Sequence, residues 1–84
     1  MSTGHEFQRT DDEIVSLLSQ WLMGSVGNDE LRKRVEDIGT AELAPGQRTA
    51  VEELLVGLAA ALPGERGDLE RVVRETMEAL AYGD

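Results

Sequence analysis

Apolar residues recur at α-helical spacing in four segments of this 84-residue chain, and glycine or proline stands between the segments. In the first segment they occupy positions i, i+3, i+4, i+7 and i+8, which lie on one face of a helix. No segment alternates apolar and polar residues as a half-buried strand would. The pattern predicts an all-α, four-helix bundle-like domain with short loops, and helices over residues 11–23, 29–38, 45–62 and 68–81.

The ends of these helices are predicted from residues that favour helix termini. Thr10 and Glu13 have the spacing of a capping box, in which each side chain accepts a hydrogen bond from a backbone amide of the first turn. Pro45 suits the first position of the third helix. Gly24 and Gly39 suit the left-handed residue that often follows a helix. In the third helix, the inward face is predicted to be Val51, Leu54, Leu55, Leu58 and Leu62.

Length and composition limit what this chain can do. Residues 1–9 lack periodicity and are predicted to be a flexible N-terminal arm, whereas residues 10–84 are predicted to form one helical domain. The chain has no cysteine, which excludes disulfides, cysteine metal sites and a thiol nucleophile. No apolar run approaches the ~20 residues of a membrane span, and the polar N-terminus is unlike a signal peptide, so we expect a cytoplasmic protein.

The charge is strongly negative, with 17 acidic residues against 8 lysines and arginines and a net charge of -9. This balance argues against nucleic-acid binding, which needs clustered cations. Three of the cations are nevertheless adjacent, at Arg32, Lys33 and Arg34. On a helix Arg32 would neighbour Glu36. The two could form a surface ion pair worth about 0–1 kcal/mol, or Glu36 could orient Arg32 toward an anion on a partner.

The third helix contains a stretch that is apolar on every side, LLVGLAAAL at residues 54–62. A helix that is apolar all round is normally buried all round. One interpretation is a central helix covered by its three neighbours. The other is a binding surface for another chain, made of small residues that allow close approach: Val56, Gly57, Ala60 and Ala61.

Enzymatic chemistry finds little support in the residues. Three serines are candidate nucleophiles, but no histidine is placed to activate any of them. An acidic helical domain of this size also suggests an acyl or peptidyl carrier. A carrier needs a serine that opens the second helix, and here Ser25 stands in a loop before Asn28-Asp29-Glu30. The carrier interpretation is therefore disfavoured.

Residues 24–38, GSVGNDELRKRVEDI, resemble the segment G-x-F-x-x-D-E-F-R-x-x-I-E-R-M of the nitrile hydratase β subunit, in its N-terminal helical part. Residues 50–56, AVEELLV, are similar to the A-L-E-x-L-L-V of the same family. Related helical modules occur in the accessory proteins that activate nitrile hydratases. The resemblance covers about residues 12–60.

The resemblance implies a role for Arg32. In that family the matching arginine reaches the α subunit and hydrogen-bonds the oxidised cysteine oxygens around a non-haem iron or non-corrin cobalt, and the motif glutamate falls on Glu36. The chain itself would then hold no metal. The implied function is a small subunit or accessory protein that binds a metal-bearing catalytic partner and is not catalytic alone.

Two differences from the family bear on this function. The family carries a Tyr-Tyr-x-x-Trp cluster where this chain reads ELAPGQRTA, at residues 42–50, and its β-barrel half has no counterpart here. An independent helper or split subunit is therefore favoured over a complete β subunit. The alternative is a free-standing homodimeric adaptor or regulator that pairs through the third helix and has no link to catalysis.

Overall fold

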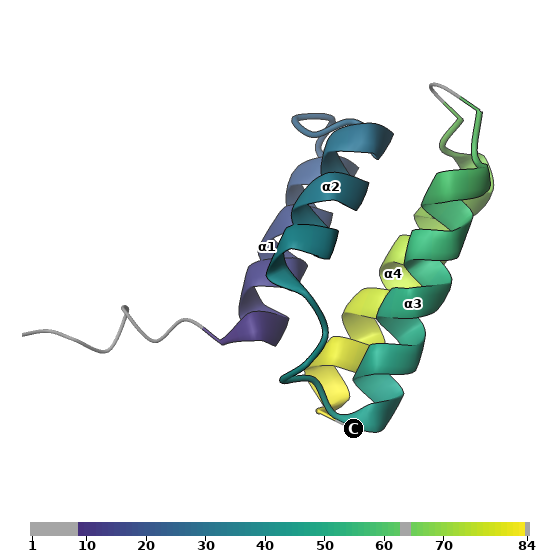
Figure 1. Ribbon diagram of the computed structural model, residues 1–84. Helices are drawn as coiled ribbons and strands as arrows, with labels where there is room; N and C mark the ends of the chain where they lie inside the picture. Colours follow the sequence, from purple (N-terminus) through teal and green to yellow (C-terminus); the bar gives the residue numbers. More distant parts are fainter. Residues whose placement is uncertain (1–8, 63–64, 84) are drawn as a thin grey trace, which may run out of the picture.

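The computed structural model describes residues 9–62 and 65–83, which form four α-helices without a strand (Figure 1). The all-α fold predicted from the periodicity is confirmed, and each helix end lies within two residues of its predicted position. The predicted arm, except Arg9, lies outside the described residues. The helices are α1 (Thr10–Leu22), α2 (Asn28–Ile38), α3 (Pro45–Ala60) and α4 (Gly67–Tyr82).

The helices pack in two neighbouring pairs. Figure 1 shows α1 beside α2 and α3 beside α4. Helix α1 also packs against α4, and α2 against α3, so each helix has two main neighbours and α1 lies diagonally across from α3. Consecutive helices are therefore adjacent in space, as short connections favour.

Apolar side chains from all four helices and two connections form one core. Trp21 and Ile14 of α1 are its largest fully buried members. Leu62 was predicted to belong to it, and that prediction is wrong. Helix α3 ends at Ala60 and Ala61 is extended, with ψ 145°, so Leu62 leaves the inward face and is 71% exposed. The buried apolar residues are Ile14, Leu17, Leu18, Trp21, Val26, Leu31, Val35, Leu43, Val51, Leu54, Leu58, Leu69, Val73 and Leu80.

The predicted capping box at the start of α1 is absent. Thr10 is already helical, so its backbone is not in the extended conformation from which a capping side chain reaches the first-turn amides. Its hydroxyl lies 3.5 Å from a carboxylate oxygen of Glu42, in the connection between α2 and α3. The side-chain contacts at this helix end come from Asp11 instead. Its carboxylate accepts a hydrogen bond from the Asp12 amide at 2.9 Å and forms an ion pair with Arg9 at 3.0 Å.

The glycine that ends α1 has the predicted role. Gly24 has φ +86°, and its amide donates to the Trp21 carbonyl at 3.0 Å. The next amide, of Ser25, donates to the Gln20 carbonyl at 2.9 Å, which completes a Schellman motif. Gly39 also has a positive φ, but its ψ is 174°, so it ends α2 by extending the chain.

Candidate functional site

Two of the three adjacent cations on α2 form ion pairs with glutamates of the same helix. Arg34 lies 3.3 Å from a carboxylate oxygen of Glu30, and Arg32 lies 3.6 Å from one of Glu36. The second distance is within ion-pair range but longer than a hydrogen bond. The Arg32 side chain keeps 34% of its surface exposed, so its guanidinium remains accessible while Glu36 stands beside it.

Arg32 and Arg34 lie on opposite flanks of α2. Arg34 lines a groove shared with α1. Arg32 stands two residues earlier, about 200° around the helix axis. It therefore lies on the flank of α2 away from α1. Helix α3 is the other main neighbour of α2. Both arginines have a glutamate partner, so what distinguishes Arg32 from Arg34 is the flank of α2 on which it lies.

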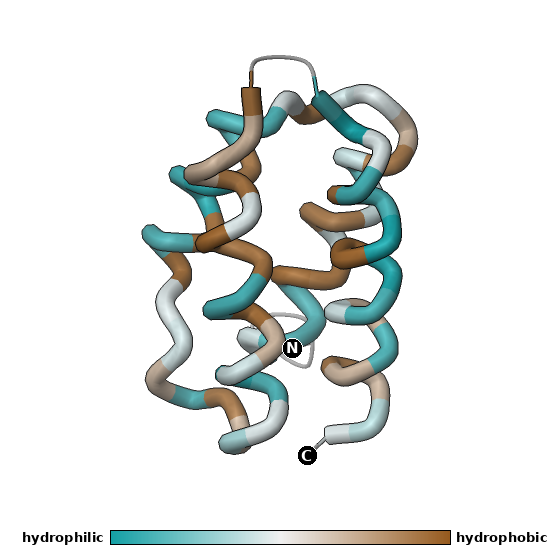
Figure 2. Tube along the Cα trace, turned by 90° about the vertical axis from the view of Figure 1, so that its right-hand side faces the viewer, coloured by the Kyte–Doolittle hydropathy of each residue, from teal (hydrophilic) through white to brown (hydrophobic). Residues whose placement is uncertain are grey.

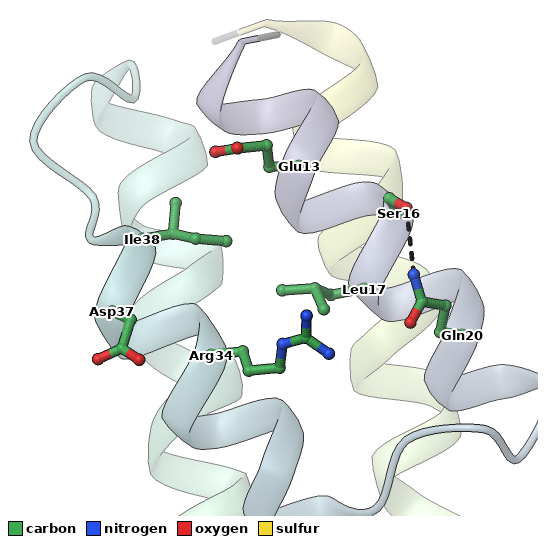
Figure 3. Close-up of a pocket in the computed structure, with 7 residues that line it drawn as sticks. All are labelled: Glu13, Ser16, Leu17, Gln20, Arg34, Asp37 and Ile38. Atoms are coloured by element: carbon green, nitrogen blue, oxygen red, sulfur yellow. Dashed lines mark hydrogen bonds between the residues drawn. The ribbon is translucent and has the colours of Figure 1, made fainter.

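The groove between α1 and α2 has a volume of about 340 Å³ and is open to solvent (Figure 3). Its apolar lining is Leu17 and Ile38, and Arg34 shares the remainder with acidic and polar side chains. Ser16 lies on its edge, where its hydroxyl oxygen stands 3.5 Å from the amide nitrogen of Gln20. An amide cannot act as a general base, so Gln20 does not activate Ser16 as a nucleophile.

The outer side of α3 is apolar over its last two turns. Val56 is 70% exposed, and Ala59 and Ala60 are exposed beside it. Figure 2 shows this stretch in brown, white and beige up to the grey connection that precedes α4. We call Val56, Ala59, Ala60 and the exposed Leu62 the α3 patch. The interpretation of α3 as a central helix covered by its three neighbours is wrong, because among the described residues only α2 and α4 pack extensively against it and this side is exposed.

Two of the four residues predicted for a binding surface, Gly57 and Ala61, are not part of the α3 patch. A Cβ atom added to Gly57 would lie 3.4 Å from Leu69, so Gly57 faces α4 and lets the two helices approach. Ala61 is half-buried and packs against the core. Val56 and Ala60 are exposed, so they remain candidate contact residues.

A second groove, of about 320 Å³, lies between the start of α2 and the end of α3. One wall is the first turn of α2 with its preceding glycine and carries the carboxylates of Asp29 and Glu30. The other wall is apolar and consists of Leu58, Ala61 and Leu62. Leu62 belongs both to this groove and to the α3 patch, so the two surfaces are continuous.

A polar cluster that no local sequence pattern indicated fixes the position of the α2 wall. The buried Trp21 donates its ring N–H to the side-chain oxygen of Asn28 at 2.7 Å, and Asn28 donates to the Glu65 carbonyl at 2.9 Å. The Arg66 guanidinium stacks over the Trp21 ring, 3.8 Å from its centre, and donates to the Trp21 carbonyl. These contacts tie the start of α2 to the start of α4.

In residues 9–62 and 65–83, which the structure describes, aspartate and glutamate side chains do not gather in a group of three or more that could hold a metal ion. None of the four helices has the length and apolar character needed to cross a bilayer.

Comparison with known proteins gives no relative. No protein-family model, no curated protein and no solved structure matches the chain. The resemblance to the nitrile hydratase β subunit therefore stays a prediction from the sequence.

Proposed function

We propose that this protein is a helical protein-interaction module and that the α3 patch is the centre of its contact surface. The observation that carries the proposal is the exposure of Val56 and Leu62, at 70% and 71%, next to two exposed alanines. Folding gains nothing from apolar side chains left in water. An apolar patch with a charged rim is typical of a protein-binding site.

The rim of this surface supports the same proposal. Glu52 and Glu53 are exposed on α3 one turn before Val56, and Arg32 and Glu36 lie on the flank of α2 away from the groove with α1. Charged side chains around an apolar centre contribute more to specificity and to the association rate than to affinity. A partner with a small apolar surface and complementary charges would fit this arrangement.

The resemblance suggests the kind of partner, a catalytic subunit with a non-haem iron or cobalt site. In this proposal Arg32 donates hydrogen bonds to anionic oxygens at that site, and Glu36 positions the guanidinium. The partial exposure of Arg32 and its 3.6 Å distance from Glu36 support the proposal, since the guanidinium has both an orienting carboxylate and free donors. The metal and its ligands would belong to the partner.

The test is co-expression with the metal-bearing α subunit of a nitrile hydratase. Arg32→Lys should impair complex formation and nitrile hydration nearly as much as Arg32→Ala, because an ammonium cannot reproduce the forked geometry of a guanidinium. Arg34→Ala is the matched control, since Arg34 belongs to the same triplet and also pairs with a glutamate four residues away. If all three variants behave like the wild type, Arg32 has no role in binding a catalytic subunit.

A second candidate function is a homodimeric adaptor, and the position of the patch on one helix favours it. A twofold axis beside the outer side of α3 would bring the patches of two copies together in an isologous interface. Ala60→Glu should then abolish dimer formation in sedimentation equilibrium. Ala81→Glu is the matched control, because Ala81 is also an exposed alanine near the end of a helix. A chain that is monomeric at high concentration would rule out the homodimer.

A further inference from the structure

The groove between the start of α2 and the end of α3 has two walls of different chemistry. Leu58, Ala61 and Leu62 form an apolar wall, and the opposite wall carries Asp29 and Glu30. Asp29 and Glu30 are exposed, so a bound segment could reach both. A ligand that fills this groove must therefore offer apolar groups on one side and cationic groups on the other.

The surroundings of the groove strengthen its negative character. The Glu65 carboxylate accepts the Leu62 amide at 3.0 Å, which adds a third acid at the rim. Arg66 lies close by in sequence but is committed to the Trp21 ring and carbonyl. No lysine or arginine lines the groove in the parts of the chain that the structure describes. With a net charge of -9, the whole protein attracts cations to such a site.

We propose that this groove binds an amphipathic helix of another protein, whose apolar face carries lysine or arginine along its edges. The proposal rests on the proposed function and names the chemistry of the partner. The apolar residues of the segment would contact Leu58 and Leu62 and continue onto the α3 patch. Its cations would pair with Asp29 and Glu30. Glu30 would then give up its ion pair with Arg34 and pair with a cation of the partner.

A helix suits the groove better than a small molecule or a second copy of this chain. The groove is open to solvent, whereas a small-molecule pocket buries about 70–90% of its ligand. Side chains at positions i, i+3, i+4 and i+7 of a helix can fill such a groove while the remaining face stays in water. A second copy would bring another net charge of -9 toward the same carboxylates.

The probe is a fluorescently labelled peptide of about 20 residues, long enough to form a helix. Leucines at i, i+3, i+4 and i+7 give it an apolar face, and lysines stand along the edges. Two control peptides are a scrambled sequence of the same composition and a version with glutamate in place of lysine. In fluorescence anisotropy with the full chain, the lysine helix should bind at least about tenfold more tightly than either control, and salt should weaken it.

Variants of the protein place the binding in the groove. Neutralising both acids with Asp29→Asn and Glu30→Gln should weaken binding of the lysine helix about threefold to tenfold. The matched control is Asp68→Asn with Glu70→Gln, because these two exposed acids occupy the first turn of α4 in the same way. Leu62→Ser should weaken binding as well, since it removes the apolar side chain shared by groove and patch.

The outcomes separate this inference from the proposed function. Equal binding of the scrambled and helical peptides, or an equal effect of the two double variants, would show attraction by net charge alone and would overturn the inference. Association that Ala60→Glu abolishes, without binding of the lysine helix, would leave the interaction module standing and refute the basic partner helix. Homodimers that bury Leu62 would also refute it.

Discussion

The two halves of α3 are alike on their inner side and different on their outer side. In the first half Gln47 and Val51 are buried and Arg48 and Glu52 face water. In the second half, taken from residue 54 onward, Leu54 and Leu58 are buried, but the outward positions are apolar. Both halves contribute buried residues to the core, whereas only the second half has apolar side chains on its exposed outer side.

This difference separates what folding requires of α3 from what it does not require. The charged outer side of the first half is what an amphipathic helix on a protein surface requires. The second half departs from that rule at Val56 and its neighbours without burying them. Departures from a local rule that bring no evident gain in stability are expected at functional sites. The comparison therefore points to the second half of α3 for function.

The largest expected effect separates the inner and outer leucines of the second half. Leu58→Ala should lower the free energy of unfolding by about 2–5 kcal/mol, because it leaves a cavity in the core. Leu62→Ala should change it by no more than about 0.5 kcal/mol, because Leu62 is exposed. Urea unfolding followed by circular dichroism measures both values. Equal losses would mean that Leu62 is buried in solution and that the α3 patch is covered.

The next effect concerns the buried amide of the first half. Gln47 accepts the Ala44 amide at 3.0 Å and donates to the Leu80 carbonyl at 2.9 Å, which joins the start of α3 to the end of α4. Gln47→Leu should cost about 1–3 kcal/mol, since it leaves buried polar groups without partners.

Thr49→Val is the control for the Gln47 variant. It also removes a side-chain hydrogen bond, to the Pro45 carbonyl at 3.0 Å, but on the exposed side where water replaces the lost partner. Its expected loss in urea unfolding is below about 0.5 kcal/mol. A Gln47→Leu protein as stable as the Thr49→Val protein would show that the buried amide does not hold α3 to α4.

The helices and most of the core could be predicted because short-range spacing determines them. Leu17 and Trp21 repeat with the period of a helix, and burial follows from that period. Gly24 could be predicted as a helix end because only glycine adopts its positive φ at little cost. Thr76 is 2% exposed and was not expected in the core. Its hydroxyl donates to the Val72 carbonyl at 2.8 Å, so the buried polar group has a hydrogen-bond partner.

The candidate site could be predicted only in part, because it depends on contacts between distant segments. The stacking of Arg66 on Trp21 joins residues 45 positions apart, and no local pattern contains it. The apolar stretch of α3 indicated a binding surface, but its outward direction depends on where α2 and α4 pack. Gly57 and Val56 are neighbours in sequence, yet one faces α4 and the other faces water.

The smallest expected effect on stability comes from making the first half of α3 resemble the second. Glu52→Ala with Glu53→Ala would extend the apolar outer side by one turn. Both glutamates are exposed and neither forms an ion pair in the part of the chain that the structure describes, so stability should change by less than about 0.5 kcal/mol. Self-association should increase, because the enlarged apolar surface gains more by leaving water.

The control must remove the same charge elsewhere, because a less negative chain also repels its copies less. Glu75→Ala with Glu78→Ala does so on α4, where both glutamates are exposed. If the α3 patch is the contact surface, sedimentation equilibrium should show stronger association for the α3 variant than for the α4 variant at equal net charge. Equal association of the two variants would attribute the effect to charge, and the two halves of α3 would then differ in composition without differing in function.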